Sequence, residues 1–209
     1  MLLRALLIWG VLLLFEAIVV VLVVPPTLVT NAASTEETLI SRSLGEDAAE
    51  NISQRARSTF DSWFVDTGVL AESFHLFVPS EEAKRNSTGI ETMAQGLFDV
   101  VRRRLESFWN LVFVGIQRAY GFMVWMPMLL PFIIAAAFDG ATVRKVKLLT
   151  FGMSSAPRYG AAMHALVILL FAPLYYAAWP FPVTPLLVPV WFIALALVIR
   201  TLVANLQRL

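Results

Sequence analysis

The chain has 209 residues, of which 58% are hydrophobic and only 15% are charged, and its mean hydropathy is +0.73. Soluble domains carry about 25% charged residues on average, so this composition indicates an integral membrane protein. The net charge of +1 provides no basic field for nucleic acid, and the lack of cysteine excludes disulfides, cysteine-based zinc sites and thiol chemistry.

Four apolar runs in the chain are long enough to form membrane-spanning helices. A hydrocarbon core of about 30 Å needs about 20 mostly apolar residues in a helix. The first run ends at Pro25 and Pro26, because proline cannot continue a helix. The four runs are residues 2–24, 121–138, 160–179 and 186–204. We therefore predict an all-α fold, a polytopic membrane protein with four transmembrane helices and an external helical segment between spans 1 and 2.

The first run has an alternative interpretation as a cleaved signal peptide. The basic residue Arg4 lies near its start, and the small residues Ala32 and Ala33 follow it. Its apolar stretch, however, exceeds the roughly 7–15 residues that are typical of a signal peptide. We therefore favour an uncleaved membrane anchor.

The cations near the span ends predict the orientation, because cytoplasmic loops carry an excess of lysine and arginine. Six cations lie on one side of the predicted membrane, against the three arginines of residues 102–104 on the other. These six are Arg4, Arg144, Lys145, Lys147, Arg158 and Arg208. Both termini and the loop 139–159 are therefore expected in the cytoplasm.

The predicted spans divide the chain into three segments. Residues 1–24 form a transmembrane anchor, residues 25–107 an external helical segment, and residues 108–209 a three-span membrane domain with the cytoplasmic loop 139–159. The external segment has 83 residues with 13 acidic and 8 basic side chains, a local charge of −5, whereas the rest of the chain carries +6. The near-neutral total therefore hides a separation of charge.

Two helices are expected in the external segment. Ser34 and Glu37 have the spacing of a capping box, which predicts a helix start, and apolar residues then recur at every fourth position over residues 40–60. Residues 74–78 are predicted to be extended. A second helix is expected to begin at Ile90 and to continue into the membrane, because its apolar residues follow a helical period.

Four polar residues fall within or beside the apolar runs. Glu16 lies inside the first run, where an unpaired charge is costly, and Arg118 and Arg200 are its candidate partners. An ion path is one interpretation, but a contact between helices is favoured because no other polar residue accompanies Glu16. We expect His164 to make one hydrogen bond between helices rather than to act as a titrating site.

No pattern of residues indicates an enzyme. The sequence contains no phosphate-binding glycine loop, no Gly-x-Ser-x-Gly and no His-Glu-x-x-His motif. His75 and His164 are the only histidines, and they form no recognisable metal-ligand set. We therefore expect no catalytic residues, no metal and no cofactor.

The second half of the chain carries a more specific set of motifs, with one further motif upstream, Trp63-Phe64-Val65-Asp66-Thr67-Gly68. The main motifs are Ala137-Phe138-Asp139-Gly140, Val143-Arg144-Lys145-Val146, Thr150-Phe151-Gly152, Ser154-Ser155-Ala156-Pro157-Arg158-Tyr159 and Arg200-Thr201-Leu202-Val203-Ala204-Asn205. Over roughly residues 55–208 the chain resembles the integrating conjugative element membrane protein family. That family is a domain of unknown function encoded near TraD-type coupling ATPases.

The resemblance implies a bacterial inner-membrane scaffold of conjugative DNA transfer by type IV secretion, without an enzymatic activity. We expect the loop 139–159 to dock the coupling ATPase. Its first acid and glycine would cap the second span, its cations would supply charge, and a later turn would supply an apolar anchor. The expected docking residues are Asp139, Gly140, Arg144, Lys145, Lys147, Phe151 and Gly152. Alternatively, the cations only enforce topology and contact lipid phosphates.

Two other functions remain open. One is a small ion-coupled transporter or channel that uses Glu16 and Arg200, and the other is an envelope exclusion or stress factor that acts through the external helices. In each case the expected partners are membrane lipids and other proteins, and direct contact with nucleic acid is not expected.

Overall fold

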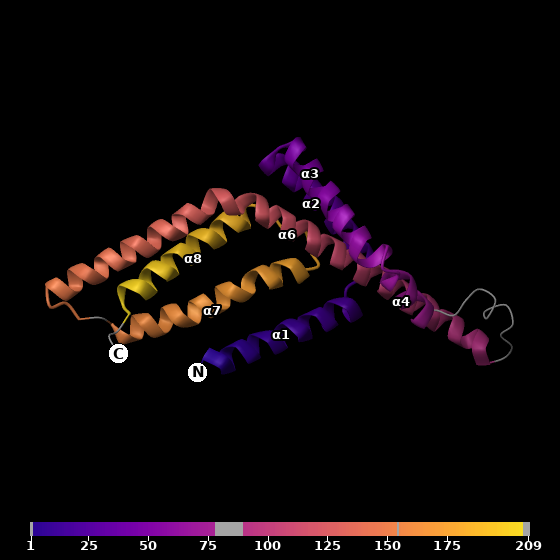
Figure 1. The fold of residues 1–209 in the computed structure, drawn as a ribbon. Helices are drawn as coiled ribbons and strands as arrows, with labels where there is room; N and C mark the ends of the chain where they lie inside the picture. The colour runs from indigo at the N-terminus through magenta and orange to yellow at the C-terminus, as the bar shows by residue number, and fades with distance from the viewer. Residues whose placement is uncertain (1, 78–89, 154, 207–209) are drawn as a thin grey trace. The chain divides into compact units, whose positions relative to one another are not determined.

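The computed structural model describes residues 2–77, 90–153 and 155–206, and every regular element among them is a helix (Figure 1). The prediction of an all-α fold is therefore confirmed for the part of the chain that is described. The elements are α1 (Leu2–Val23), α2 (Pro26–Leu44), α3 (Glu46–Phe60), the π-helix η1 (Asp61–Val65), α4 (Val69–Phe77), α6 (Ile90–Leu149), α7 (Ala156–Ala178) and α8 (Leu187–Ala204).

In the described part of the chain, three helices are long and apolar enough to cross a membrane: Phe98–Leu149 within α6, and the whole of α7 and α8. The prediction of four spans is therefore wrong for the described residues. Among the described side chains, α1 contributes a shorter apolar helix, Leu7–Val20.

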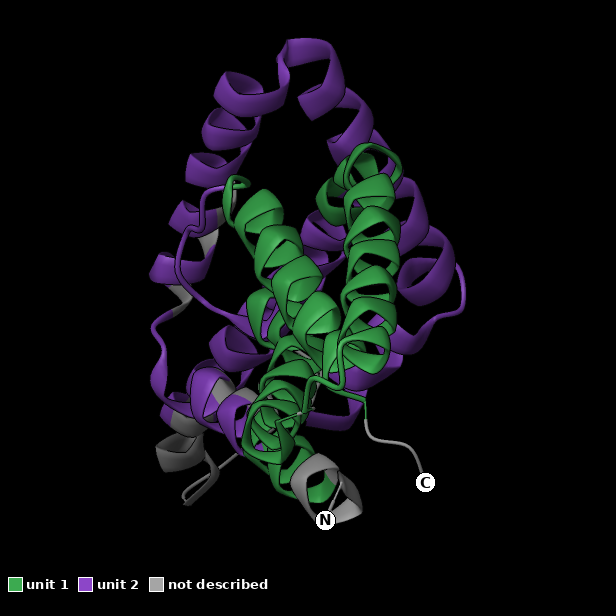
Figure 2. Cartoon of the chain, turned by 90° about the vertical axis from the view of Figure 1, so that its left-hand side faces the viewer, with its two compact units in different colours: residues 1–14, 121–176, 185–209 green, residues 15–120, 177–184 purple. Residues whose placement is uncertain are grey.

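The chain divides into two compact units (Figure 2). Unit 1 consists of residues 1–14, 121–176 and 185–209, and unit 2 consists of residues 15–120 and 177–184. Both α1 and α6 contribute residues to both units. The two units are defined by packing alone, so the expected segments 1–24, 25–107 and 108–209 stay predictions.

In unit 1 the second half of α6 packs with α8 through apolar side chains. Leu129, Val188 and Phe192 are buried together, and the aromatic rings of Phe122 and Trp191 lie against them. The ring centroids of Phe122 and Trp191 are 5.0 Å apart in an edge-to-face arrangement. Aromatic pairs prefer this geometry, so it adds a directional contact to the apolar packing.

A proline inside α7 exposes a carbonyl group that another helix satisfies. Pro173 has no N–H, so the carbonyl of Leu169, four residues earlier, receives no helical hydrogen bond from it. Trp191 of α8 donates its Nε1–H to that carbonyl oxygen at 2.8 Å. The proline therefore creates an acceptor that links α7 to α8.

In unit 2 the chain turns back on itself between α2 and α3. Gly45 joins the two helices with φ +92, in the left-handed region that favours glycine. Ile40, Ala49 and Ile52 are buried together across the resulting hairpin. The fourfold spacing over residues 40–60 therefore belongs to two packed helices, and the prediction of one continuous helix is wrong.

Two further local predictions in unit 2 are also wrong. The helix that contains Ser34 already begins at Pro26, and the Ser34 hydroxyl donates to the carbonyl of Asn31 instead of capping a terminus. Residues 74–77 belong to the helix α4 and are not extended, while residue 78 lies outside the described part. The predicted helix start at Ile90 is confirmed by α6.

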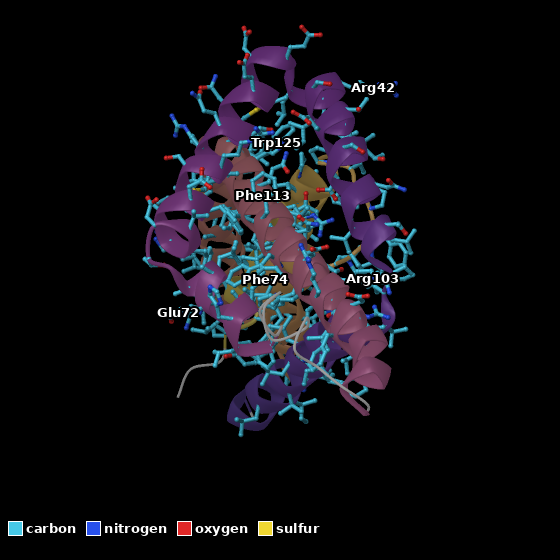
Figure 3. All side chains as sticks on the ribbon, turned by 90° about the vertical axis from the view of Figure 1, so that its right-hand side faces the viewer. Arg42, Glu72, Phe74, Arg103, Phe113 and Trp125 are labelled. Carbon is cyan, nitrogen blue, oxygen red and sulfur yellow. The ribbon has the colours of Figure 1, made fainter. Side chains whose placement is uncertain are left out.

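An aromatic cluster holds α3 and η1 against α6 in unit 2. The centroid of the Trp109 ring lies 6.0 Å from that of Phe60 and 5.1 Å from that of Phe64, and Phe60 also meets the Phe113 ring at 5.9 Å. Figure 3 shows Phe113 among the helices, whereas the charged side chain of Arg42 points outward. Helices α3 and η1 thus share an aromatic core with α6.

Candidate functional site

The expected docking loop is much shorter than predicted. Helix α6 continues through Asp139 and Gly140 and ends only at Leu149, so these two residues do not cap a span as expected. The connection to α7 is confined to residues 150–155, of which residue 154 lies outside the described part. The Gly140 signal for a helix end was misleading, because this glycine serves packing instead.

Asp139 and Gly140 both contact α8 within unit 1. The Asp139 carboxylate forms an ion pair with the guanidinium of Arg200, and the two side chains are 52% and 48% exposed. At Gly140 a Cβ atom would lie only 2.7 Å from the carbonyl oxygen of Arg200. Glycine therefore allows the two helix backbones to approach closely at this level.

Lys147 bonds to the C-terminal end of α8. Its Nζ donates to the carbonyl oxygen of Ala204 at 3.2 Å and to Oδ1 of Asn205 at 3.0 Å. The same Oδ1 accepts the backbone N–H of Ser155 at 3.4 Å, and the Asn205 Nδ2 donates to the carbonyl of Thr201 at 2.8 Å. Buried Asn205 therefore connects the ends of α6 and α8 with the start of α7.

The connection between α6 and α7 presents apolar side chains outward from a defined backbone. We name residues 149–153 the Phe151 turn. Phe151 and Met153 are 96% and 92% exposed, and Leu149 is also exposed. Phe151 adopts φ +54, which is uncommon for a residue other than glycine, and the N–H of Gly152 donates to the carbonyl of Lys147 at 2.7 Å. The predicted turn at Phe151 and Gly152 is therefore present.

The other two expected docking cations, Arg144 and Lys145, differ in accessibility. Lys145 is exposed and Arg144 is partly buried on the last turns of α6, and Arg158 is exposed at the start of α7. The structure thus separates one structural cation from a group that faces outward around the Phe151 turn.

Arg118, expected as an intramembrane partner of Glu16, instead pairs with Glu36 of α2 inside unit 2. The Arg118 Nε lies 3.1 and 3.0 Å from the two Glu36 carboxylate oxygens, and Nη2 bonds to the same carboxylate. The side chains are 1% and 2% exposed. This pair is therefore enclosed by protein.

The same pair holds the irregular segment 177–184. The Arg118 guanidinium donates to the carbonyls of Trp179 at 2.5 Å and Phe181 at 2.8 Å, with a longer contact to that of Ala177 at 3.5 Å. The Glu36 carboxylate accepts the N–H of Val183 at 2.8 Å. We call these groups the Arg118 cluster. It provides partners for backbone groups that no helix satisfies.

Glu36 is the functional residue that sequence reasoning missed. The capping-box pattern drew attention to Glu37, which is exposed. Glu36 lies four residues after buried Ala32 and four before buried Ile40, so it occupies the apolar stripe of α2. An acid within an apolar stripe indicates a buried partner, and this signal could have found it.

The other polar residues for which contacts were predicted are Glu16, Arg200 and His164. Both carboxylate oxygens of Glu16 lack a hydrogen-bond partner among the described residues, and Arg200 pairs with Asp139. His164 is exposed, and its Nδ1 lies 2.8 Å from the carbonyl oxygen of Gly160 in the same helix. The predicted hydrogen bond from His164 to another helix is therefore wrong.

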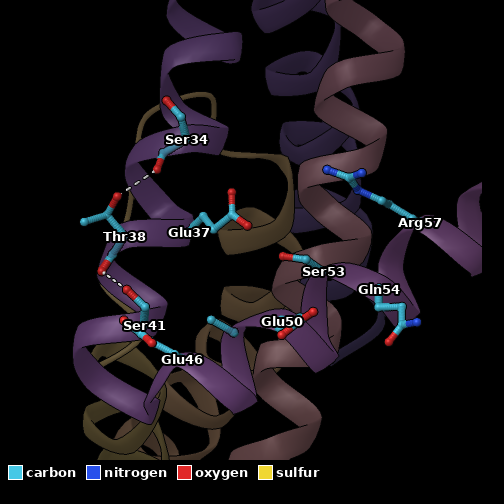
Figure 4. Close-up of a pocket in the computed structure, with 10 residues that line it drawn as sticks. Ser34, Glu37, Thr38, Ser41, Glu46, Glu50, Ser53, Gln54 and Arg57 are labelled. Carbon is cyan, nitrogen blue, oxygen red and sulfur yellow. Dashed lines mark hydrogen bonds between the residues drawn. The ribbon is translucent and has the colours of Figure 1, made fainter.

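A polar groove of about 690 Å³ lies along the α2–α3 hairpin (Figure 4). Its charged side chains are the three glutamates at 37, 46 and 50 and one arginine at 57, so the groove is acidic. Serine and threonine hydroxyls of α2 bond to backbone carbonyls one helical turn earlier, as Thr38 does with Ser34 at 3.1 Å. Within the described residues, no group of three or more histidine, aspartate or glutamate side chains could hold a metal ion.

Residues 25–207, which include α2 to α8, match the model of a protein family described as IncC plasmid conjugative DNA transfer protein DtrJ-like. The chain belongs to the DtrJ-like family. This membership confirms the predicted association with conjugative DNA transfer. The narrower resemblance to integrating-element proteins and the link to a TraD-type ATPase stay predictions.

The DtrJ-like match extends further toward the N-terminus than the resemblance over residues 55–208. It begins at residue 25 and so includes both Glu36 and Arg118, the two charged members of the Arg118 cluster. No curated protein and no solved structure matches the DtrJ-like chain.

Proposed function

We propose that this DtrJ-like protein is a non-enzymatic scaffold of the conjugative transfer apparatus in the bacterial inner membrane. In this proposal the Phe151 turn docks the coupling ATPase, and the three apolar helices hold the turn at the membrane. The protein binds lipids and protein partners and makes no direct contact with the transferred DNA.

The single observation that carries the proposal is the exposed Phe151 side chain on an ordered backbone. An aromatic side chain that is 96% exposed has a large apolar area to bury against a partner. The hydrogen bonds of Lys147 and Asn205 hold the flanking helix ends, so docking would not require the turn to fold first.

Charge around the turn supports the cytoplasmic location that the proposal requires. Lys145 and Arg158 are exposed beside the turn, and cytoplasmic loops are enriched in such cations. With this orientation and three spans, the C-terminal end of α8 also lies in the cytoplasm, whereas the chain before α6 lies on the opposite side of the membrane. The same cations would guide an acidic surface of the ATPase toward the turn.

The test is a mating assay of Phe151→Ala in the full chain, combined with crosslinking to the coupling ATPase in donor cells. We expect transfer and crosslinking to fall roughly tenfold, because aromatic anchors contribute much of the binding energy at interfaces. Protein abundance in the membrane should stay unchanged, since Phe151 packs against almost nothing in the monomer.

Phe138→Ala is the matched control, because Phe138 is another exposed phenylalanine, 71% exposed on the body of α6. It should leave both transfer and crosslinking unchanged. Equal losses in the two variants, or normal crosslinking in Phe151→Ala, would reject the Phe151 turn as the docking site.

A further inference from the structure

We infer that unit 1 contains a binding site for one hydrocarbon chain of a membrane lipid. A cavity of about 160 Å³ lies between α6, α7 and α8, the three helices that are long and apolar enough to cross a membrane. The residues that form its wall include Phe122, Ala172, Pro173, Tyr176, Val188 and Trp191.

Most residues that line the cavity are apolar, and the indole N–H of one of them, Trp191, already has an acceptor. Pro173 leaves the Leu169 carbonyl without its helical donor, and Trp191 supplies the missing N–H at 2.8 Å. This bond satisfies both polar groups, so neither is left to hold a water molecule. A water in a protein cavity requires about two to four polar partners, and this lining offers few.

The size of the cavity fits a short piece of hydrocarbon. An engineered apolar cavity of about 150 Å³ binds benzene, so a cavity of similar volume accepts a comparable length of acyl chain. Phe122 and Trp191 form one rigid side, with their ring centroids 5.0 Å apart, and the small side chain of Ala172 leaves the space open. An acyl chain in the cavity would supply the dispersion contacts that the wall side chains otherwise lack.

The location of the cavity identifies the occupant as lipid. All three lining helices are candidate spans, so the medium around them is hydrocarbon rather than water. Leu187, which also lines the cavity, is 46% exposed at the start of α8 and would contact the same medium. No charged side chain lines the cavity, so the site selects an acyl chain and not a particular headgroup.

The experiment uses the full chain in vesicles of phosphatidylethanolamine and phosphatidylglycerol that contain a phosphatidylethanolamine with a photoreactive acyl chain. In the unmodified chain, we expect the label to concentrate on the peptides that carry Phe122 and Trp191. Uniform labelling along the exposed faces of α7 would overturn the inference without any mutation.

Substitution of Ala172 provides the second measurement. Ala172→Phe should reduce labelling of the cavity peptides roughly tenfold by filling the space, whereas Ala161→Phe, at an exposed position of α7 outside the cavity wall, should not. If the Ala172→Phe variant does not fold, the smaller substitution Ala172→Leu is used instead. Unchanged labelling in a folded Ala172 variant would refute the site.

A partner helix is the competing occupant. Its apolar side chain would exclude lipid in donor-cell membranes that contain the whole transfer apparatus, while leaving the cavity of the purified chain open. Cavity labelling in vesicles but not in such membranes would therefore overturn the lipid assignment.

Discussion

Two ion pairs of this protein join helices in different ways. Arg118 and Glu36 lie in unit 2 with almost no exposure, and the pair also binds the backbone of residues 177–184. Arg200 and Asp139 lie in unit 1 and are about half exposed. Water can replace either partner of the exposed pair but not of the buried one. The same two chemical groups should therefore differ greatly in their effect on stability.

The largest effect is expected from Arg118→Ala. The change leaves the buried Glu36 carboxylate and the carbonyls of Trp179 and Phe181 without their donor, and removing one partner of a buried pair costs about 3–5 kcal/mol. Thermal unfolding in mild detergent should show this loss, and limited proteolysis should show new cleavage within residues 177–184.

Arg103→Ala is the control for this change, because Arg103 is an exposed arginine on the same helix. It should leave the unfolding temperature within about a degree of the unmodified protein, since exposed substitutions rarely alter stability much. A similar loss in both variants would mean that the burial of Arg118 is not what matters.

The next prediction concerns two glycines of α6, whose replacement by alanine should change the stability of the protein in opposite directions. Gly140→Ala places a Cβ atom 2.7 Å from the Arg200 backbone oxygen, which should destabilise the protein by about 1–3 kcal/mol. Gly121→Ala meets no atom within 4 Å and should stabilise the helix by about 0.5–1 kcal/mol. Unfolding temperatures that shift in the same direction would contradict the close approach of α6 and α8.

Arg200→Ala should have a smaller effect than either of these changes at packed sites. An exposed ion pair contributes about 0–1 kcal/mol, and salt screens it. The difference in unfolding temperature between Arg200→Ala and the unmodified protein should therefore shrink further in high salt. A loss as large as that of Arg118→Ala would show that the Asp139 pair is buried in the membrane-embedded protein.

The smallest effect is expected from Glu16→Gln. The Glu16 carboxylate has no hydrogen-bond partner among the described residues, so the substitution breaks no ion pair there and keeps the side-chain shape. Conjugative transfer should remain normal in a mating assay. A strong loss of transfer with normal protein abundance would favour the ion-coupled alternative over the scaffold.

The candidate spans α7 and α8 could be predicted because their signal is local. A long apolar run with a proline or polar boundary is sufficient to place α7 and α8 within a few residues. The hairpin of α2 and α3 was harder, since apolar residues continue on both sides of Gly45 and only its positive φ reveals the turn. Apolar periodicity predicts which face of a helix is buried, but it does not predict which neighbouring helix covers that face.

The candidate site was only partly predictable for the same reason. The turn at Phe151 follows from its own residues, but the bond from Lys147 to Asn205 joins positions 58 apart in the chain. The Arg118 cluster joins three distant segments, and its acid had to be distinguished from the adjacent Glu37. Contacts of this range depend on the assembled packing, which a single sequence does not display.

The bonds of Asn205 also impose an order on the completion of the Phe151 turn. Lys147 at the end of α6 and Ser155 before α7 both bond to Asn205, which the ribosome adds about fifty positions later. A chain that stops before residue 205 would insert its apolar helices yet lack the groups that hold the turn. The Phe151 turn thus gains these contacts only after translation has passed α8.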